Sequence, residues 1–134
     1  MALGPSVLNP SGPIETVMHF DLRGAPPTIT AALLEVPVQC LDPGGSDGSI
    51  AFYVFEGDGE ASLDEYYLGT LETTKTGLTV MYETVSVDMT TAVQAAITAG
   101  YDYIGFRLLS PPGGDRFNLG NAGGVANPTL TCTW

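Results

Sequence analysis

The side chains of this sequence that could perform chemistry are few. His19 is the single histidine, and it lies in the apolar stretch TVMHFDL, where a histidine packed within a strand is the ordinary case. Without a second histidine it lacks the usual company of a metal ligand, and no serine has the context of a hydrolase nucleophile. A pair of carboxylates that cleaves a glycosidic bond remains an alternative, because acids distant in sequence can meet in the fold. We therefore expect no catalytic centre, with a carboxylate-dependent glycan-active enzyme as a weaker alternative.

Acidic side chains gather in two turn-like stretches, residues 42–47 (DPGGSD) and 56–60 (EGDGE). Calcium takes about six to eight oxygen ligands from carboxylates and turn carbonyls. Either stretch could thus bind a structural calcium ion, with these candidate ligands: Asp42, Asp47, Asp58 and Glu60. Neither stretch matches an EF-hand loop, and Asp and Gly are also ordinary turn residues. We expect either no cofactor or a structural calcium ion.

Tyrosines are the candidate ligand-binding side chains, because a sugar ring stacks on an exposed aromatic face. Tyr66 and Tyr67 stand together in an acidic, polar stretch. Tyr82, Tyr103 and Tyr101 would join them if neighbouring strand faces bring these rings close. The alternative for each ring is packing within the sheet, which is the common role of tyrosine in strands.

Two cysteines, Cys40 and Cys132, fall at the ends of two predicted strands, about 90 residues apart. A disulfide closing so long a loop would contribute about 4 kcal/mol in the chain-entropy account. The alternatives are two buried small hydrophobes or free thiols. Alone they cannot form a metal site, since no further thiol or histidine lies near either one.

The charge balance excludes two classes of partner. The 134 residues carry fifteen acids against four bases, a net charge of −11. Binding of nucleic acid or of anionic lipid needs clustered Lys and Arg, and the four bases are dispersed: Arg23, Lys75, Arg107 and Arg116. No apolar run reaches about 18 residues, so we expect no membrane insertion. The opening MALGPSVLNPSGP has no basic start and no apolar core, so we identify no signal peptide in this chain.

Alternation of apolar and polar residues predicts one all-β domain over residues 14–134, after an irregular N-terminal arm at 1–13 that could pack along an edge. Strands are expected at 16–22, 29–39 (bent or at an edge near Pro37), 50–56, 78–87 (two strands or one bent strand), 103–109 and 129–134, with 63–71 open between strand and loop and 111–127 a Gly-rich loop. One short helix is predicted at about 91–99, with a capping box of Thr91 and Gln94 and a stop at Gly100. About eight short antiparallel strands are typical of a β-sandwich of the jelly-roll type.

The order of three segments resembles a known family. FDLRGAPPTITAALLEV, VSVDMTTAVQAAITAGYDYIGFRLLSP and NPTLTCTW follow one another as in the secreted β-sandwich domains called DNRLRE or disaggregatase-related modules, over about residues 17–134. The resemblance implies a jelly-roll domain outside the cytoplasm, non-catalytic, attached to polysaccharide-active or adhesive proteins. The N-terminal stretch is shorter than in that family, so a truncated, swapped or partner-supplied first strand is open.

These observations predict a non-catalytic extracellular or cell-surface binding module for polysaccharide or another glycan. The alternative is a structural, self-assembling subunit of a surface layer, an extracellular filament or a capsid decoration, in which the N-terminal arm contacts identical subunits.

Overall fold

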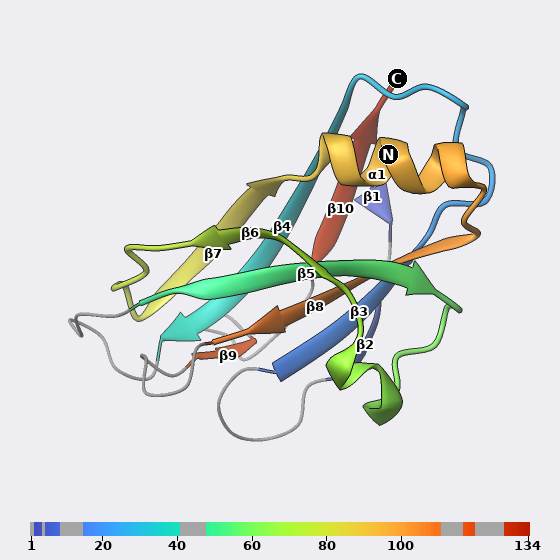
Figure 1. The fold of residues 1–134 in the computed structure, drawn as a ribbon. Coiled ribbons are helices and arrows are strands. Elements are labelled where there is room, and N and C mark those ends of the chain that lie inside the picture. The colour runs from blue at the N-terminus through green and yellow to red at the C-terminus, as the bar shows by residue number, and fades with distance from the viewer. Residues whose placement is uncertain (1, 4, 9–14, 41–47, 111–116, 120–127) are drawn as a thin grey trace.

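Two antiparallel five-stranded sheets form the protein (Figure 1). The structure, a computed structural model, describes residues 2–3, 5–8, 15–40, 48–110, 117–119 and 128–134. The first sheet has the order β1 (Ala2–Leu3), β10 (Thr129–Thr133), β4 (Ala31–Cys40) and β7 (Tyr82–Asp88), and β9 (Phe117–Leu119) also pairs with β4. The second sheet has the order β2 (Pro5–Leu8), β3 (Glu15–Asp21), β8 (Tyr103–Leu109), β5 (Ile50–Gly57) and β6 (Thr70–Lys75).

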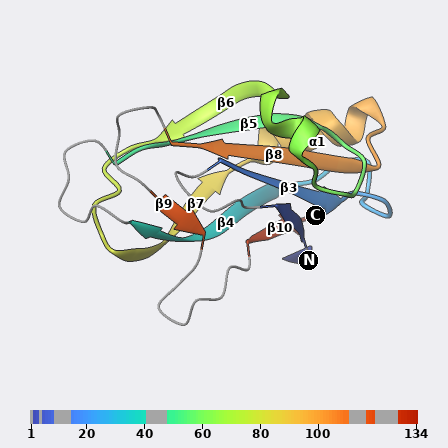
Figure 2. The same ribbon diagram turned by 90° about the horizontal axis from the view of Figure 1, so that it is seen from below.

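The two sheets lie face to face as layers of a sandwich (Figure 2). Eight of the strands follow the paths β1-β10-β4-β7 and β3-β8-β5-β6, which is the strand order of a jelly roll. The chain changes from one sheet to the other after β1, β3, β4, β6, β7 and β8. The predicted fold class is therefore confirmed, with β2 and β9 as additional short strands.

The period-two pattern read from the sequence is the pattern of burial. Along β4, Leu34, Val36 and Val38 are buried, while the residues between them are exposed or half-buried. The rings of Phe20 and Phe106 meet edge to face, 5.9 Å apart, in the layer between the sheets. Side chains fully withdrawn from solvent come from both sheets: Met18, Phe20, Leu34, Ile50, Phe52, Ile104, Phe106, Leu108, Phe117 and Leu130.

Pro37 lies inside β4 without breaking it. On one side β4 pairs with β7 from Leu33 to Gln39, and Pro37 stands opposite Thr84. On the other side β10 pairs as far as Glu35 and β9 begins at Val38. Pro37 thus occupies the gap between two partner strands, where a residue without a backbone N–H disturbs the pairing least. The sheet edge predicted near Pro37 is therefore this local gap between β10 and β9.

The N-terminal arm is not irregular as predicted. Its described residues form β1, which pairs with β10 in the first sheet, and β2, which pairs with β3 in the second. These described residues therefore pack along an edge of each sheet of their own chain, because backbone pairing is available at both edges. The division of the chain into an arm at 1–13 and a domain at 14–134 stays a prediction.

The helix α1 (Thr90–Ala99) confirms the predicted helix, and Gly100 ends it in the left-handed conformation at φ 81°. The predicted capping box is wrong. Met89 is the N-cap, and the amide of Thr90 donates to Oδ1 of Asp88 (2.9 Å). The Gln94 side chain instead accepts from the amide of Ile29 and donates to the carbonyl of residue 27, so it ties α1 to the loop before β4.

Three further segments differ in detail from the sequence-based expectations. Residues 63–71 hold a 3-10 helix, η1 (Leu63–Tyr67), followed by the start of β6. The strand predicted at 78–87 begins only at Tyr82, although Leu78 is buried in the core. The predicted loop 111–127 contains the strand β9, whose first residue, Phe117, is fully buried. Each exception is a short element that tertiary contacts stabilise and local pattern does not reveal.

The cysteines form no disulfide. Cys132 stands opposite Ala32 in the pairing of β10 with β4, and Cys40 lies eight residues further along β4. At about 3.3 Å per residue the Cα atoms are roughly 26 Å apart, far beyond the roughly 7 Å that a disulfide spans. Both side chains are buried thiols, and burial raises the pKa of Cys132. The alternative of two buried small side chains is the correct one.

Candidate functional site

The β5–β6 connection, residues 58–69, contains η1 and contacts β3 and β8 on the outer face of the second sheet. His19 on β3 points to this outer face, because its neighbours Met18 and Phe20 point inward to the core. Opposite His19 on β8 is Gly105, which carries no side chain. The Phe55 ring occupies that space, so near that a Cβ on Gly105 would overlap it, and it contacts the imidazole edge to face at 5.4 Å.

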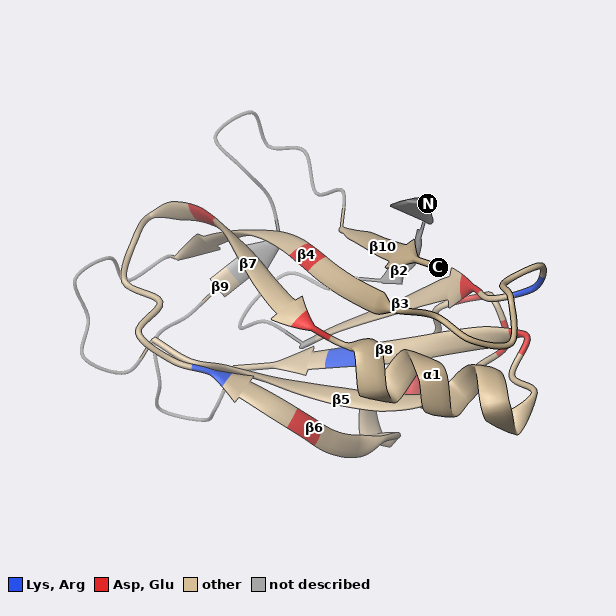
Figure 3. Ribbon diagram, turned by 90° about the horizontal axis from the view of Figure 1, so that it is seen from above, with Lys and Arg blue, Asp and Glu red and all other residues tan. Residues whose placement is uncertain are grey.

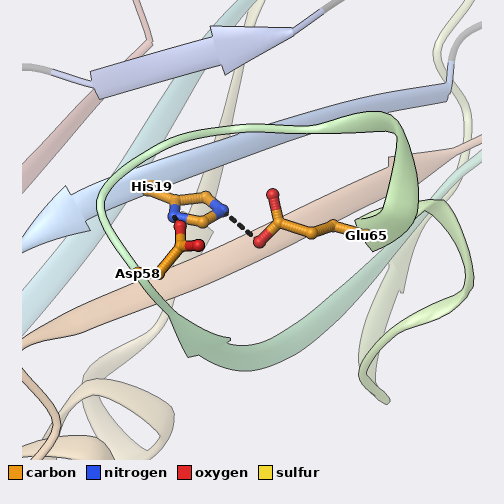
Figure 4. A group of neighbouring side chains, drawn as sticks. All are labelled: His19, Asp58 and Glu65. Carbon is orange, nitrogen blue, oxygen red and sulfur yellow. Dashed lines mark ion pairs between the residues drawn. The ribbon is translucent and has the colours of Figure 1, made fainter.

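His19, Asp58 and Glu65 meet beneath this connection (Figure 4). Nε2 of His19 lies 2.8 Å from Oε2 of Glu65, and Nδ1 lies 3.5 Å from Oδ1 of Asp58. His19 and Glu65 are buried, whereas the side chain of Asp58 is 77% exposed. A buried imidazole therefore stands between one buried and one solvated carboxylate.

Hydrogen bonding identifies the tautomer of His19. The amide of Gly59 donates to Nδ1 over 3.0 Å, so Nδ1 carries a lone pair. The proton of the neutral ring is then on Nε2, on the side of Glu65. The direction of that N–H bond does not give a hydrogen bond of good geometry to Glu65 despite the short distance, so the contact is mainly electrostatic.

Glu65 also organises η1. Its Oε1 accepts a hydrogen bond from the amide of Ser62 (2.7 Å) and lies 3.3 Å from the Ser62 hydroxyl. Ser62 is the N-cap of η1 and Glu65 is its third residue, which is the spacing of a capping box. One buried carboxylate thus holds the start of η1 and faces the imidazole on β3. The S-x-x-E spacing is a signal for this contact that the sequence-based prediction of the site missed.

Arg107 on β8 holds the end of η1. Its guanidinium donates to the carbonyl oxygens of Tyr66 (2.8 Å) and Leu68 (2.9 Å), the two residues that flank Tyr67. It lies 4.1 Å over the ring of Tyr53 and is 8% exposed. An arginine that binds two nearby backbone carbonyls in this way fixes the path of the chain at Tyr67.

Tyr67 is the most exposed large apolar side chain among the described residues, with 91% of its surface accessible. Its neighbour Tyr66 is half-buried. Asp64 on η1 is exposed, and so are Asp58 and Glu60 on the same connection. An aromatic ring and several carboxylates thus reach solvent from a segment whose backbone is tied to β3 and β8.

Tyr103 lies on the same side of the molecule as the β5–β6 connection, but its ring already contacts residues of its own chain. Gly59 approaches its ring so closely that a Cβ there would lie 2.8 Å from ring carbons. The guanidinium of Arg23 lies 4.9 Å from its centroid, and that guanidinium also pairs with Asp21 at 2.8 Å. Tyr103 therefore serves mainly as packing for the turn at residues 57–59.

Tyr82 does not join the other tyrosines. It begins β7 in the first sheet, opposite Gln39, whereas the β5–β6 connection covers the second sheet. Figure 1 shows the start of β7 and η1 on different parts of the molecule. Tyr101 lies after α1 and packs partly buried against the core. Of the tyrosines predicted to bind a ligand, Tyr82 thus lies on the first sheet, whereas Tyr66, Tyr67 and Tyr103 lie on the side of the second sheet.

The candidate calcium ligands are placed only in part. Asp42 and Asp47 lie outside the described residues. Asp58 accepts from the amide of Glu60 (3.0 Å), as an ordinary turn residue does. His19, Asp58 and Glu65 each offer one potential ligand atom, and these atoms lie within 4.8 Å of one another. Nδ1 of His19 already accepts a hydrogen bond from the amide of Gly59. Calcium binding stays a prediction.

A groove of about 360 Å³ lies between α1 and strands β5 and β6. Its helix side consists of alanines, which offer no hydrogen bond to a polar ligand. Thr70 and Glu72 on β6 border it, and Tyr101 lies at its end. This groove fits a polar ligand less well than the β5–β6 connection does.

Charge is distributed without a basic cluster over the part of the chain that the structure describes. Acidic residues are spread over β4, β6, β7 and the connections, and the few basic residues lie apart from one another on different elements (Figure 3). No helix in the described ranges has the length and apolar character to cross a membrane.

The comparisons with known proteins add no relative. No protein-family model matches this chain, and no curated protein matches it at a significant level. The resemblance to DNRLRE or disaggregatase-related modules therefore stays a prediction based on the order of its segments.

Proposed function

We propose that this chain is a non-catalytic extracellular module that binds polysaccharide or another glycan, and that the β5–β6 connection is its binding face. The observation that carries the proposal is the 91% exposure of Tyr67 on a backbone held by buried groups. An exposed ring offers a flat apolar face to a pyranose, and the carboxylates of Asp58, Glu60 and Asp64 are acceptors for sugar hydroxyls.

Rigidity of the connection supports the same proposal. Arg107 and Glu65 fix both ends of η1, so little conformational freedom is lost there when a ligand binds. A binding surface that is ordered before the ligand arrives loses less entropy on association, which raises affinity. The jelly-roll sandwich supplies the rigid sheet on which this surface rests.

The test begins with a glycan array, and the affinity for the best ligand is then measured by calorimetry. Tyr67→Ala is expected to weaken binding about tenfold, because stacking of an aromatic ring contributes roughly 1 kcal/mol or more beyond buried area. Tyr82→Ala, a partly exposed tyrosine on the other sheet, is the matched control and should bind as the original chain does. No binding to any glycan, or equal affinity of both variants, would contradict the proposal.

A self-assembling subunit is the second candidate. The observation in its favour is a set of exposed apolar side chains beside the sheet edges β6 and β7: Leu71, Val80 and Met81. Edge strands with apolar neighbours can pair with a second chain. The N-terminal arm pairs with its own sheets and so gives this candidate no support. Sedimentation at increasing concentration tests it, and a monomer at every concentration would exclude it.

A further inference from the structure

An aromatic ring and a carboxylate lie on the same side of η1. Asp64 and Tyr67 stand three residues apart in this 3-10 helix, and both side chains are exposed, Tyr67 to 91%. A 3-10 helix has three residues per turn, so side chains at positions i and i+3 lie one above the other. The carboxylate of Asp64 is therefore one turn, about 6 Å along the helix axis, from the residue that carries the exposed ring.

No basic side chain of the described residues is available to bind an anion on this surface. Arg107 is 8% exposed, and its guanidinium donates to two backbone carbonyls at the end of η1. Arg23 is exposed, but its guanidinium donates two hydrogen bonds to the carboxylate of Asp21, at 3.0 and 2.8 Å. Lys75 stands opposite Ile50, whose side chain lies in the core, so Lys75 extends from the inner side of β6.

The exposed carboxylates of Asp58, Glu60 and Asp64 therefore give the β5–β6 connection a net negative charge. We propose that the glycan bound there is a polymer of amino sugars with free, protonated amino groups, such as glucosamine, an assignment that rests on the proposed function. The apolar face of one sugar stacks on Tyr67, and its ammonium group pairs with the carboxylate one turn away. The aromatic ring itself also attracts a cation placed near its face.

The same charges argue against an anionic glycan. A uronic acid or a sulfated sugar stacked on Tyr67 would bring a second negative charge beside Asp64, and like charges repel at short distance. A neutral sugar can stack on the ring and donate hydrogen bonds, but it gains no ion pair. The expected order of affinity is therefore amino glycan first, neutral glycan second and anionic glycan last.

Two oligosaccharides of equal length separate charge from stacking. An oligomer of glucosamine carries free amino groups, whereas its fully N-acetylated counterpart keeps the sugar rings and has no charge. Calorimetry at a mildly acidic pH, where the amino groups are protonated, should show about tenfold tighter binding of the glucosamine oligomer, because several exposed ion pairs contribute. Salt should remove this advantage, since the screening length falls from about 10 Å at 0.1 M to about 3 Å at 1 M.

Three variants assign the preference to this surface, after circular dichroism has shown that each is folded. Asp64→Asn should weaken binding of the glucosamine oligomer about two- to fivefold, as expected for one exposed ion pair, and leave binding of the N-acetylated oligomer unchanged. Glu35→Gln on β4 removes the same charge from the first sheet, so it is the matched control and should change neither affinity. Tyr67→Ala should weaken binding of both oligomers.

Equal affinity for the two oligomers would overturn the inference, and so would equal losses in Asp64→Asn and Glu35→Gln, which would show a general effect of the net charge of −11. Tighter binding of a neutral or anionic glycan that depends on Tyr67 would also overturn it, while the proposed function would stand. If no glycan binds at all, the proposed function fails and the ligand class fails with it.

Discussion

Replacement of Glu65 by Gln tests the arrangement around His19 most directly. The carboxylate accepts a hydrogen bond from the amide of Ser62 at 2.7 Å, and on its other side it faces Nε2–H of His19 at 2.8 Å. A glutamine amide has one acceptor and one donor end. Whichever way it turns, its N–H₂ group meets another donor, since both neighbours carry hydrogens. We expect Glu65→Gln to destabilise the fold although the side chain keeps its size and shape.

The magnitude follows from one buried donor left without an acceptor, which costs about 1–3 kcal/mol. The entropy of unfolding for 134 residues is about 0.28 kcal/mol/K near 60 °C. The melting temperature should therefore fall by about 4–11 °C. Loss of the negative charge opposite His19 adds in the same direction, because a buried carboxylate and a ring N–H attract.

Urea unfolding followed by far-ultraviolet circular dichroism at neutral pH measures this change. Glu60→Gln is the control, since Glu60 is exposed and surface substitutions usually change stability by less than about 0.5 kcal/mol. The contrary result is a free energy of unfolding of Glu65→Gln within about 0.5 kcal/mol of that of the original chain. In that case the glutamine amide must donate to a lone pair on Nε2 of His19. That result would refute the tautomer deduced from the hydrogen bond of Gly59 to Nδ1.

Two further outcomes follow from the fold. Cys40 and Cys132 should both react with a thiol reagent only after unfolding, because both side chains are buried. Oxidation of the native chain should form no intramolecular disulfide. Rapid labelling of the native chain by the reagent would contradict the burial of these thiols. Asp88→Ala should destabilise the protein because hydrogen bonds from Thr90 to Asp88 are lost, and these hydrogen bonds lower the pKa of Asp88. Since the pKa is lowered in the folded state, this contribution is complete above the ordinary value of 3.8 and is lost as the pH falls through the lower pKa of the folded state. A difference that persists in strong acid in circular-dichroism melts would refute this role.

The sequence determined the fold class because alternation is a local property. Residues such as those of β4 place every second side chain on one face, and a strand with that pattern must bury it against another layer. The helix α1 was predicted from equally local signals, since the spacing of its apolar residues and Gly100 define its length and end. Turn residues between the strands then favoured a sandwich.

Only the tertiary structure decided the partners of individual side chains. His19 looked like an ordinary strand residue, and no local pattern shows that the β5–β6 connection returns to place Asp58 and Glu65 on either side of its ring. The cysteines were ambiguous for the same reason: strand ends are visible in the sequence, whereas the register that separates Cys40 from Cys132 by eight residues of β4 is not. Contacts across sheets depend on which strands pair and in which register, and a linear pattern does not contain that information.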